Sequence, residues 1–302
     1  MILGVTGGLG FLGHHFVTRA LHAGHRCWVI DAETYAADRR HLEEWSARDC
    51  QYGCADIVTL DRLPDVEVLI NFAAETHVDN SIRDSRAFLH SNVLGVQHLL
   101  TLIQETPAYA RPRFLQISTD EVYGTVLEGS VAEDAPLRPS SPYAASKAAA
   151  DLLLHAAAVT YGIRYNILRP SNCYGTGQHP EKLIPKAIRY ARTGRPFPRY
   201  GDGGAERSWL DVDDCAEAVL RVLSYGREHT VYNIAGNTAA NTIAILNAID
   251  PHGPVVAADR SGLDRRYSVA DAPLRALGWT PQGDLWRDLP GILEAERATG
   301  RW

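Results

Sequence analysis

A glycine-rich turn near the start of the chain constrains its fold more than any other feature. The apolar run Ile2–Thr6 predicts a short buried strand, and Gly7, Gly10 and Gly13 follow it. Apolar residues then recur at helical spacing: Phe16, Val17, Ala20 and Leu21. Glycines between a first strand and a first helix let the backbone turn tightly and approach a pyrophosphate, which rests on the helix amino end. The turn therefore predicts an α/β fold with a doubly wound parallel sheet, the Rossmann fold, that binds a dinucleotide.

The dinucleotide is predicted to be NAD. The strand expected at 27–30 ends in Asp31, roughly twenty residues after the glycine turn, where a carboxylate accepts hydrogen bonds from a ribose diol. This carboxylate would repel the 2′-phosphate of NADP. A capping or turn role for Asp31 is the alternative. A third strand expected at 51–55 leads to Asp56 and Ile57, an acid–apolar pair that could reach the adenine.

Three polar residues follow another buried strand, expected at 114–117. They are Thr119, Asp120 and Glu121. Open α/β sheets bind their ligands at the carboxyl ends of the strands. Two adjacent carboxyl groups are costly there unless they have partners or a function. The position therefore predicts a chemical role for this stretch.

Tyr143 and Lys147 enter an alanine-rich helical segment about twenty residues later. They are four residues apart, so both side chains lie on one helix face. A nearby ammonium favours the phenolate and would lower the tyrosine pKa from about 10 toward neutrality. A lone Tyr-x-x-x-Lys is equally an ordinary surface pair. The upstream acidic pair and the glycine turn favour a catalytic base.

Two further segments leave alternatives open. The strand expected at 66–72 runs into Ala73 and Ala74, whose small side chains allow close approach of a cofactor, and then into His77. A lone histidine is either structural or a phosphate or sugar contact. Apolar residues recur at helical spacing from Phe88 to Ile103. Core packing explains this stripe, and so would a dimer face.

Composition changes near residue 172 and indicates two lobes. We expect residues 1–172 to form the NAD-binding domain and 173–302 mainly a smaller C-terminal substrate-binding lobe, with part of about 208–236 returning to the first domain. Arg207 and Arg260 in the second lobe suit a diphosphate, although either could be a surface charge. Residues 281–302 predict a terminal helix.

Charge, hydropathy and cysteine content limit the binding partners and the compartment expected for this chain. The chain has 302 residues, a net charge of -6 and no basic run, so neither nucleic acid nor an anionic membrane is expected as a partner. It opens on a strand and has no apolar stretch long enough to cross a bilayer, so we expect no signal peptide and no membrane span. The five cysteines are scattered, which favours reduced thiols in the cytoplasm and no metal site.

Taken together, these stretches resemble the extended short-chain dehydrogenase/reductases, and most closely the dTDP-glucose 4,6-dehydratase family. The resemblance runs from Gly7 to about Pro281. Its most specific part is the Thr-Asp-Glu triplet. Related epimerases usually carry small or apolar residues in place of Asp120 and Glu121. Related decarboxylases and GDP-mannose dehydratases tend to keep the glutamate alone.

The resemblance implies an NAD-dependent hydro-lyase that converts dTDP-glucose to dTDP-4-keto-6-deoxyglucose and water. Tyr143, assisted by Lys147, would take the 4-hydroxyl proton, and Thr119 would bond to the 4-oxygen. Glu121 would then remove the proton on carbon 5, and Asp120 would protonate the departing 6-hydroxyl. The family's NAD contacts fall on Gly7, Gly10, Phe11, Leu12, Gly13, Asp31, Asp56, Ile57, Ala73, Ala74, Tyr143, Lys147 and Cys173. Its sugar-nucleotide contacts fall on His77, Thr119, Asn172, Lys182, Leu183, Tyr200, Arg207, Asn241, Arg260 and Tyr267.

Departures from the family pattern leave the nucleoside and the exact sugar open. Leu263 stands where the family has a histidine, Ser208 where it has an aspartate, and Cys173 where it has an asparagine. Another nucleotide-hexose dehydratase, an epimerase or a decarboxylase of the same superfamily is the alternative. A non-catalytic NAD-binding protein on this fold would be expected to lose its catalytic residues, and all are present.

The resemblance also implies a homodimer built through a four-helix bundle. In that arrangement the stripe from Phe88 to Ile103 pairs across a two-fold axis with an apolar face of the Tyr143 helix. That face includes Leu152, Leu153 and Val159.

Overall fold

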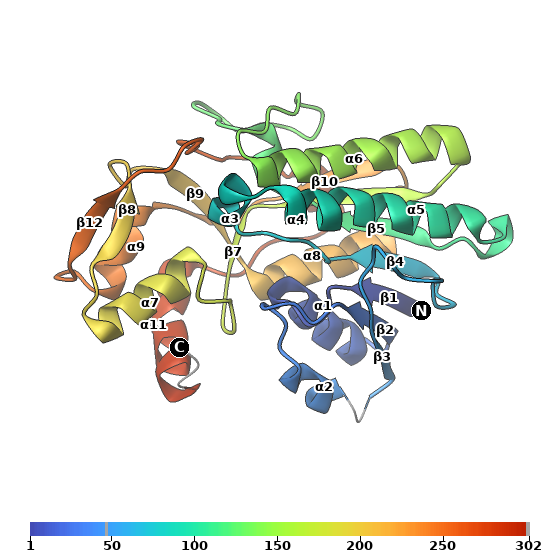
Figure 1. The fold of residues 1–302 in the computed structure, drawn as a ribbon, viewed down its shortest axis with the longest axis horizontal. Helices are drawn as coiled ribbons and strands as arrows, with labels where there is room; N and C mark the ends of the chain where they lie inside the picture. Colours follow the sequence, from blue (N-terminus) through green and yellow to red (C-terminus); the bar gives the residue numbers. More distant parts are fainter. Residues whose placement is uncertain (46–47, 300–302) are drawn as a thin grey trace.

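A seven-stranded parallel sheet forms the centre of the computed structural model, which describes residues 1–45 and 48–299 (Figure 1). The strand order is β10-β6-β5-β4-β1-β2-β3. The strands are β1 (Ile2–Thr6), β2 (Arg26–Asp31), β3 (Cys50–Cys54), β4 (Val68–Asn71), β5 (Arg113–Ile117), β6 (Tyr165–Pro170) and β10 (Thr230–Ile234). The chain winds outward from β1 to β3 and then returns to β4 on the other side of β1. Such a reversal opens a ligand crevice at the carboxyl ends of the strands. The predicted fold class is confirmed.

Helices cover both faces of this sheet. On one face α1 (Phe11–His22) packs against α8 (Val212–Tyr225), and their core includes Phe16 and Val219. On the other face α5 (Gly95–Glu105) lies beside α6 (Pro142–Tyr161), over Leu69 and Phe114 (Figure 1). The shorter helices of this half are α2 (Arg40–Trp45), α3 (Val78–Arg83) and α4 (Arg86–Phe88). Both faces are therefore buried, as an all-parallel sheet requires.

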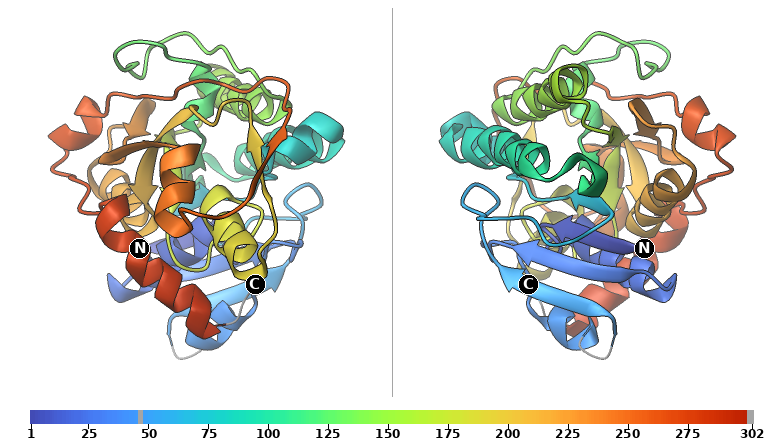
Figure 2. Two further views of the ribbon diagram at one scale, coloured as in Figure 1. Left: turned by 90° about the vertical axis from the view of Figure 1, so that its left-hand side faces the viewer. Right: turned by 90° about the vertical axis from the view of Figure 1, so that its right-hand side faces the viewer.

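The second lobe is smaller and lies beside the carboxyl ends of the strands (Figures 1 and 2). It contains a three-stranded sheet in the order β11-β9-β7 and a two-stranded pair, β12-β8. Its core includes Tyr174, Trp209 and Ile245. Its elements are β7 (Asn172–Tyr174), α7 (Leu183–Thr193), β8 (Phe197–Tyr200), β9 (Glu206–Asp211), β11 (Thr238–Asn241), α9 (Thr242–Ile249), β12 (Val255–Ala258), α10 (Ala272–Ala276) and α11 (Leu285–Thr299).

The chain crosses between the two lobes more than once. Within the segment 208–236, α8 packs on α1 and β10 pairs with β6 at the edge of the large sheet. A second crossing was not foreseen: Leu274 and Trp279 pack into the same core as α1 and α8. Helix α11 covers Leu285–Thr299 of the expected terminal helix, and residues 300–302 lie outside the described part of the chain.

The apolar stripe from Phe88 to Ile103 belongs to the core of one chain. A π-helical turn at Leu89–Leu94 joins α4 to α5. Phe88, Val96, Leu99, Leu100 and Ile103 are buried beneath these helices. The stripe as a whole therefore cannot be a dimer face, because its side chains are already packed. The large apolar side chains that these helices leave exposed include Leu89 and Leu94, with Leu152 and Val159 on α6.

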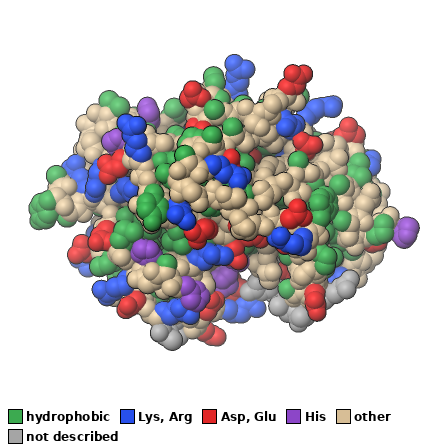
Figure 3. All heavy atoms as spheres, turned by 180° about the vertical axis from the view of Figure 1, so that it is seen from behind, with side chains coloured by type: hydrophobic (Ala, Val, Ile, Leu, Met, Phe, Trp, Pro, Cys, Tyr) green, Lys and Arg blue, Asp and Glu red, His purple; other side chains and the backbone are tan. Residues whose placement is uncertain are grey.

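The exterior is mixed in charge. Basic and acidic side chains are interspersed over the face drawn in Figure 3. Among the described residues, no helix is both long and apolar enough to cross a bilayer. The described cysteines are free thiols.

Candidate active site

Three connected cavities lie at the carboxyl edge of the large sheet. One of about 570 Å³ follows the ends of β1, β2 and β4 and is lined by Asp31 and Ile57. The next, of about 510 Å³, shares Gly7 and Gly10 with it and reaches Tyr143. We refer to these two as the cofactor cleft. A third of about 210 Å³, the sugar cavity, lies against the second lobe and shares residues such as Lys182 with the cleft.

The glycine turn is closed so tightly that side chains would not fit. Gly7 has φ +69°, and a Cβ there would lie 2.5 Å from the backbone nitrogen of Ala73. A Cβ on Gly13 would lie 2.2 Å from the carbonyl oxygen of Gly7. Gly10 caps the amino end of α1 and lines both cavities of the cleft. The turn thus presents a helix amino end to the cleft, as a pyrophosphate site requires.

Asp31 is held by two backbone bonds at the end of β2. Its Oδ2 accepts from Leu9 N at 2.9 Å and its Oδ1 from Glu33 N at 2.8 Å. Burial raises the pKa of this carboxyl group, and the two bonds oppose the rise. Each oxygen can accept a further bond, so the turn role and a ribose role coexist. Further expected residues of the adenosine end also line the cleft: Asp56, Ile57, Ala73 and Ala74. The donors and space of the cleft fit NAD.

The carboxyl groups of Asp120 and Glu121 face one cavity because the chain bends after β5. Asp120–Tyr123 form a 3₁₀ turn, and the Thr119 side chain caps it by accepting from Glu121 N at 3.3 Å. On an extended chain, adjacent side chains would point to opposite sides. In the turn, Asp120 and Glu121 both line the cofactor cleft beside Tyr143.

The environments of these carboxyl groups differ. Burial raises the pKa of Asp120 to about 8, and the charge of Glu121 adds to the rise. Asp120 Oδ2 has no hydrogen-bond partner within the described chain. Burial also raises the pKa of Glu121, but the charges of Arg207 and Arg260 oppose this. Asp120 is therefore protonated at neutral pH and available as an acid.

Tyr143 stands in the first turn of α6. Ser141 caps this helix by accepting from Ala144 N at 3.1 Å, and Pro142 occupies its start. Tyr143 is buried, and burial raises its pKa above the usual value, with the charge of Glu121 acting in the same direction. The expectation that Lys147 lowers this pKa toward neutrality is therefore wrong for the structure as it stands.

Lys147 is bound elsewhere. Its Nζ donates to the carbonyl oxygen of Ile117 at 2.5 Å, and the side chain lies beneath the cleft rather than in its lining. Burial lowers the pKa of Lys147 to about 8, and the charge of Asp151 opposes this. Asp151 in turn pairs with Arg169 at 3.0 Å, both fully buried. The chain of charges fixes α6 against β5 and β6.

The sugar cavity gathers most of the expected nucleotide-sugar residues. They are His77, Asn172, Lys182, Leu183, Tyr200, Arg207, Arg260 and Tyr267. Asn241 is not among its lining residues: its Oδ1 accepts from Ala244 N at 2.9 Å and caps α9. Four buried polar atoms of residues that line the cavity have no hydrogen-bond partner within the described chain, namely Nδ1 of His77, Oδ1 of Asp79, Oδ1 of Asn172 and Nε of Arg260. Such atoms suit a polar ligand.

Two arginine side chains of the sugar cavity, Arg260 and Arg207, are held in place by other residues of the chain. Arg260 Nη1 lies 3.5 Å from Asp79 Oδ1. The Arg207 guanidinium donates to the carbonyl oxygen of Asp264 at 3.0 Å and lies 4.2 Å from the ring centroid of Tyr267. Fixed guanidinium groups are well suited to bind a diphosphate.

The family model for the NAD dependent epimerase/dehydratase family matches residues 3–235. The chain belongs to this family. A dTDP-glucose 4,6-dehydratase from Xanthomonas campestris pv. campestris (strain B100) is 40% identical over 309 residues, covering 92% of this chain and 88% of the relative. A dTDP-glucose 4,6-dehydratase from Mycolicibacterium smegmatis is 38% identical over 318 residues, covering 100% of this chain and 95% of the relative.

Solved structures agree with this membership. A dTDP-glucose 4,6-dehydratase from Streptomyces venezuelae with NAD bound superposes with a TM-score of 0.92 at 37% identity, covering 100% of this chain and 99% of that one. A UDP-glucose 4-epimerase from Thermus thermophilus, also with NAD, superposes with a TM-score of 0.87 at 27% identity, covering 98% of this chain and 99% of that one. Dehydratases and epimerases of the family thus share the fold, and only the site residues can separate them.

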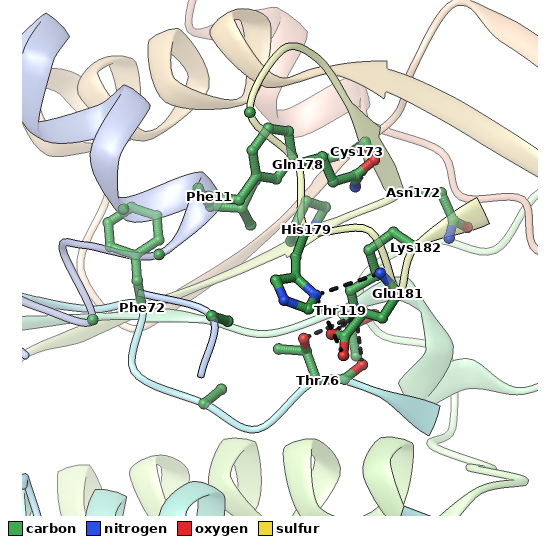
Figure 4. Close-up of a pocket in the computed structure, with 18 of the residues that line it drawn as sticks. Phe11, Phe72, Thr76, Thr119, Asn172, Cys173, Gln178, His179, Glu181 and Lys182 are labelled. Carbon is green, nitrogen blue, oxygen red and sulfur yellow. Dashed lines mark hydrogen bonds and ion pairs between the residues drawn. The ribbon is translucent and has the colours of Figure 1, made fainter. Parts of the chain in front are cut away.

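The sequence analysis did not predict two residues that line both the cleft and the sugar cavity, Thr76 and Glu181. Figure 4 shows their side chains gathered with those of His179 and the expected Lys182. Asp79 accepts a 2.6 Å bond from Tyr200. The position of Glu181 directly before the expected Lys182 was the available signal.

Of the three residues that depart from the family pattern, two line a cavity and one does not. Leu263 lines the sugar cavity, and Cys173 lines the cofactor cleft. Ser208 lies on β9, is not among the lining residues, and its Oγ donates to the carbonyl oxygen of Gly236 at 3.3 Å. Leu263 is thus the departure placed to contact the sugar nucleotide.

Helices α1 and α2 bring together side chains of the types that bind metal ions. His14, His41 and Glu44 bring ligand atoms within 4.8 Å of one another. The two imidazole rings are stacked, however, with centroids 3.4 Å apart and planes within 11° of parallel. Parallel rings direct their lone pairs side by side rather than toward one ion, whereas zinc needs converging lone pairs at about 2 Å. The arrangement does not form a coordination sphere.

Proposed function

We propose that the protein is an NAD-dependent nucleotide-sugar 4,6-dehydratase, a hydro-lyase that converts dTDP-glucose to dTDP-4-keto-6-deoxyglucose and water. The observation that carries this proposal is the pair Asp120 and Glu121, which share one cavity with Tyr143. Epimerisation at carbon 4 requires only the oxidation and reduction for which Tyr143 suffices. Elimination of water also requires a base and an acid, and this site has both.

The chain's residues divide the reaction as follows. NAD, held in the cleft by the glycine turn and Asp31, would supply the hydride acceptor for carbon 4 and the hydride donor for carbon 6. Tyr143 takes the proton of the 4-hydroxyl, while Thr119 bonds to the same oxygen. The transfer requires a lower tyrosine pKa, which the positive charge of NAD⁺ favours. Glu121 then removes the proton on carbon 5, which the ketone has made acidic, and protonated Asp120 donates to the departing hydroxide. Glu121 gives its proton back to carbon 5 when hydride reaches carbon 6, and the 4-keto-6-deoxy sugar results.

The remaining lining residues bind and orient. We propose that the glycine turn and Asp31 hold the pyrophosphate and the adenosine ribose, and that Cys173 lines the nicotinamide end. Arg207, Arg260 and Lys182 are proposed to bind the diphosphate. Leu263, in place of a histidine, gives the sugar cavity an apolar contact, so the base and the sugar must be found by experiment.

The decisive test is incubation with a panel of nucleotide sugars, read by mass spectrometry. The proposal expects one of these sugars to lose one water molecule. Its product should carry a methyl group at carbon 6. A product of unchanged mass would indicate an epimerase, and loss of carbon dioxide a decarboxylase. Denaturing the purified protein should also release NAD, and NADP as the main nucleotide would contradict the role of Asp31.

We propose a homodimer through α5 and α6. Leu152 and Val159 on α6 are 62% and 82% exposed, and Leu89 and Leu94 near α5 are 50% and 55% exposed. Helices α5 and α6 lie side by side, so a second copy could cover these side chains in a four-helix bundle.

The free thiols favour a reducing compartment, and we propose that the enzyme acts in the cytoplasm.

A further inference from the structure

Two opposite walls of the cofactor cleft are joined by a hydrogen bond. Tyr35 lies on the loop after β2, and Glu181 on the segment between β7 and α7. Both line the cavity of about 510 Å³. The Tyr35 hydroxyl donates to the Glu181 carboxylate, 3.0 Å from Oε2 and 3.3 Å from Oε1. The bond therefore spans the opening between the sheet domain and the second lobe.

The acceptor side of this bond is rigid. The Glu181 carboxylate lies 3.5 Å from Lys182 Nζ and 3.6 Å from His179 Nδ1. Lys182 Nζ also donates to the hydroxyl and carbonyl oxygens of Thr76, at 2.9 and 3.0 Å. The side chains of Thr76, His179, Glu181 and Lys182 are drawn together in Figure 4. The Glu181 side chain is only 12% exposed. Through Lys182 it is also connected to Thr76, on the loop that follows β4. Tyr35 therefore binds an acceptor that a third loop holds in place.

The donor side is more accessible to solvent. Tyr35 is 53% exposed, and its ring meets His179 edge-on with centroids 5.2 Å apart. Burial of the hydroxyl and the charge of Glu181 raise its pKa, so the phenol stays protonated and remains a donor at neutral pH. Next to it, Ala36 and Ala37 line the cleft. Movement of this loop would open the cleft along its length.

We propose that Tyr35 and Glu181 form a clasp that keeps NAD in its cleft between the two halves of the catalytic cycle. Hydride taken from a sugar must return to the same sugar, so loss of the reduced cofactor would strand the intermediate. A charge-assisted bond across the opening slows this loss, because the walls cannot part without breaking it. The inference rests on NAD binding and holds for a dehydratase or an epimerase alike.

The test measures cofactor exchange without any sugar. Holoenzyme is mixed with an excess of isotopically labelled NAD, desalted at intervals and denatured, and the released nucleotide is analysed by mass spectrometry. Tyr35→Phe removes one hydroxyl and keeps the ring. We expect exchange at least about tenfold faster, which corresponds to the loss of one hydrogen bond to a charged group. Exchange at the wild-type rate would overturn the clasp.

Tyr52→Phe is the matched control. The Tyr52 hydroxyl also donates to a glutamate, Glu33, but both residues belong to the sheet domain and the bond does not cross the cleft. This variant should exchange at the wild-type rate, and an equal acceleration would indicate general loosening instead. Glu181→Gln should also accelerate exchange. Glutamine can still accept from the Tyr35 hydroxyl but lacks the charge, so Glu181→Gln weakens the same bond that Tyr35→Phe removes. Combined with Tyr35→Phe, Glu181→Gln should therefore add nothing; additive effects would contradict the proposal.

Discussion

Lys147 Nζ lies 2.5 Å from the carbonyl oxygen of Ile117, the last residue of β5. This contact ties the helix of Tyr143 to the strand that leads directly into Thr119, Asp120 and Glu121. The lysine therefore sets the distance between the tyrosine and the acidic pair, in addition to any charge it lends to the reaction. This buried bond, together with the Asp151–Arg169 pair, holds Tyr143 beside the acidic pair.

Asp120→Asn should separate oxidation from elimination. The amide cannot donate the proton that the leaving hydroxide needs, so product formation should fall by about 10²-fold or more. Oxidation at carbon 4 does not need Asp120, so reduced cofactor should accumulate and be seen by its absorbance. Near-normal dehydration by this variant would show that the acid is misassigned.

Two companion variants check the other roles. Glu121→Gln should still permit oxidation but suppress exchange of the carbon 5 proton with solvent deuterium. Tyr143→Phe should give no reduced cofactor at all, because the 4-hydroxyl keeps its proton. Reduction of the cofactor by Tyr143→Phe would refute the base assignment even if the reaction is correct.

The pKa of Asp120 predicts a pH-dependent cost to stability. Folding raises this pKa from 3.8 to about 8, so between those values the folded state holds a proton that the unfolded state releases. The free energy of unfolding should therefore fall as pH rises across this window, by at most about 1.4 kcal/mol per pH unit from this group. Denaturant unfolding should be compared at pH 5 and pH 8. The free energy of unfolding of Asp120→Asn, relative to that of the wild type, should be higher at pH 8 than at pH 5. The exposed control Asp134→Asn should show no such increase.

Arg260→Ala should weaken binding of a nucleoside diphosphate tenfold or more. Losing one charge-assisted contact costs about 1.5–3 kcal/mol, and the change also leaves Asp79 without its cationic partner. Arg265→Ala is the matched control, because Arg265 lies on the same loop, is exposed, and does not line the sugar cavity. Calorimetric titration should detect the difference; equal affinities for both variants would place the diphosphate elsewhere.

The dimer should depend on side chains that one chain leaves exposed. Light scattering at micromolar concentration should give twice the chain mass of 33.2 kDa. Val159→Lys should reduce it toward the monomer, because a charge in an apolar bundle is costly. The same change at an exposed apolar position away from these helices, Val256→Lys, should leave the mass unchanged. A wild-type monomer would exclude the bundle.

Local patterns determined much of this protein from its sequence. The strand, glycine turn and helix at residues 2–22 follow from the order of residues along a short stretch. The spacing of Tyr143 and Lys147 on one helix face is equally local, and so is the position of Thr119–Glu121 at a strand end. Neighbours along the chain decide such features, so the fold class and the chemical centre could be predicted.

Tertiary structure alone decided which residues meet and what charge they carry. The pKa of Tyr143 rises because burial and Glu121 outweigh any help from Lys147, which is bound to Ile117. Asn241 caps a helix, and the stripe from Phe88 packs inside one chain. Tyr35 and Glu181 are far apart in sequence and meet only because the second lobe, which contains β7, lies beside the carboxyl ends of the strands of the large sheet. Burial, and contacts between distant segments, are sums over the whole fold, which spacing along the sequence does not encode.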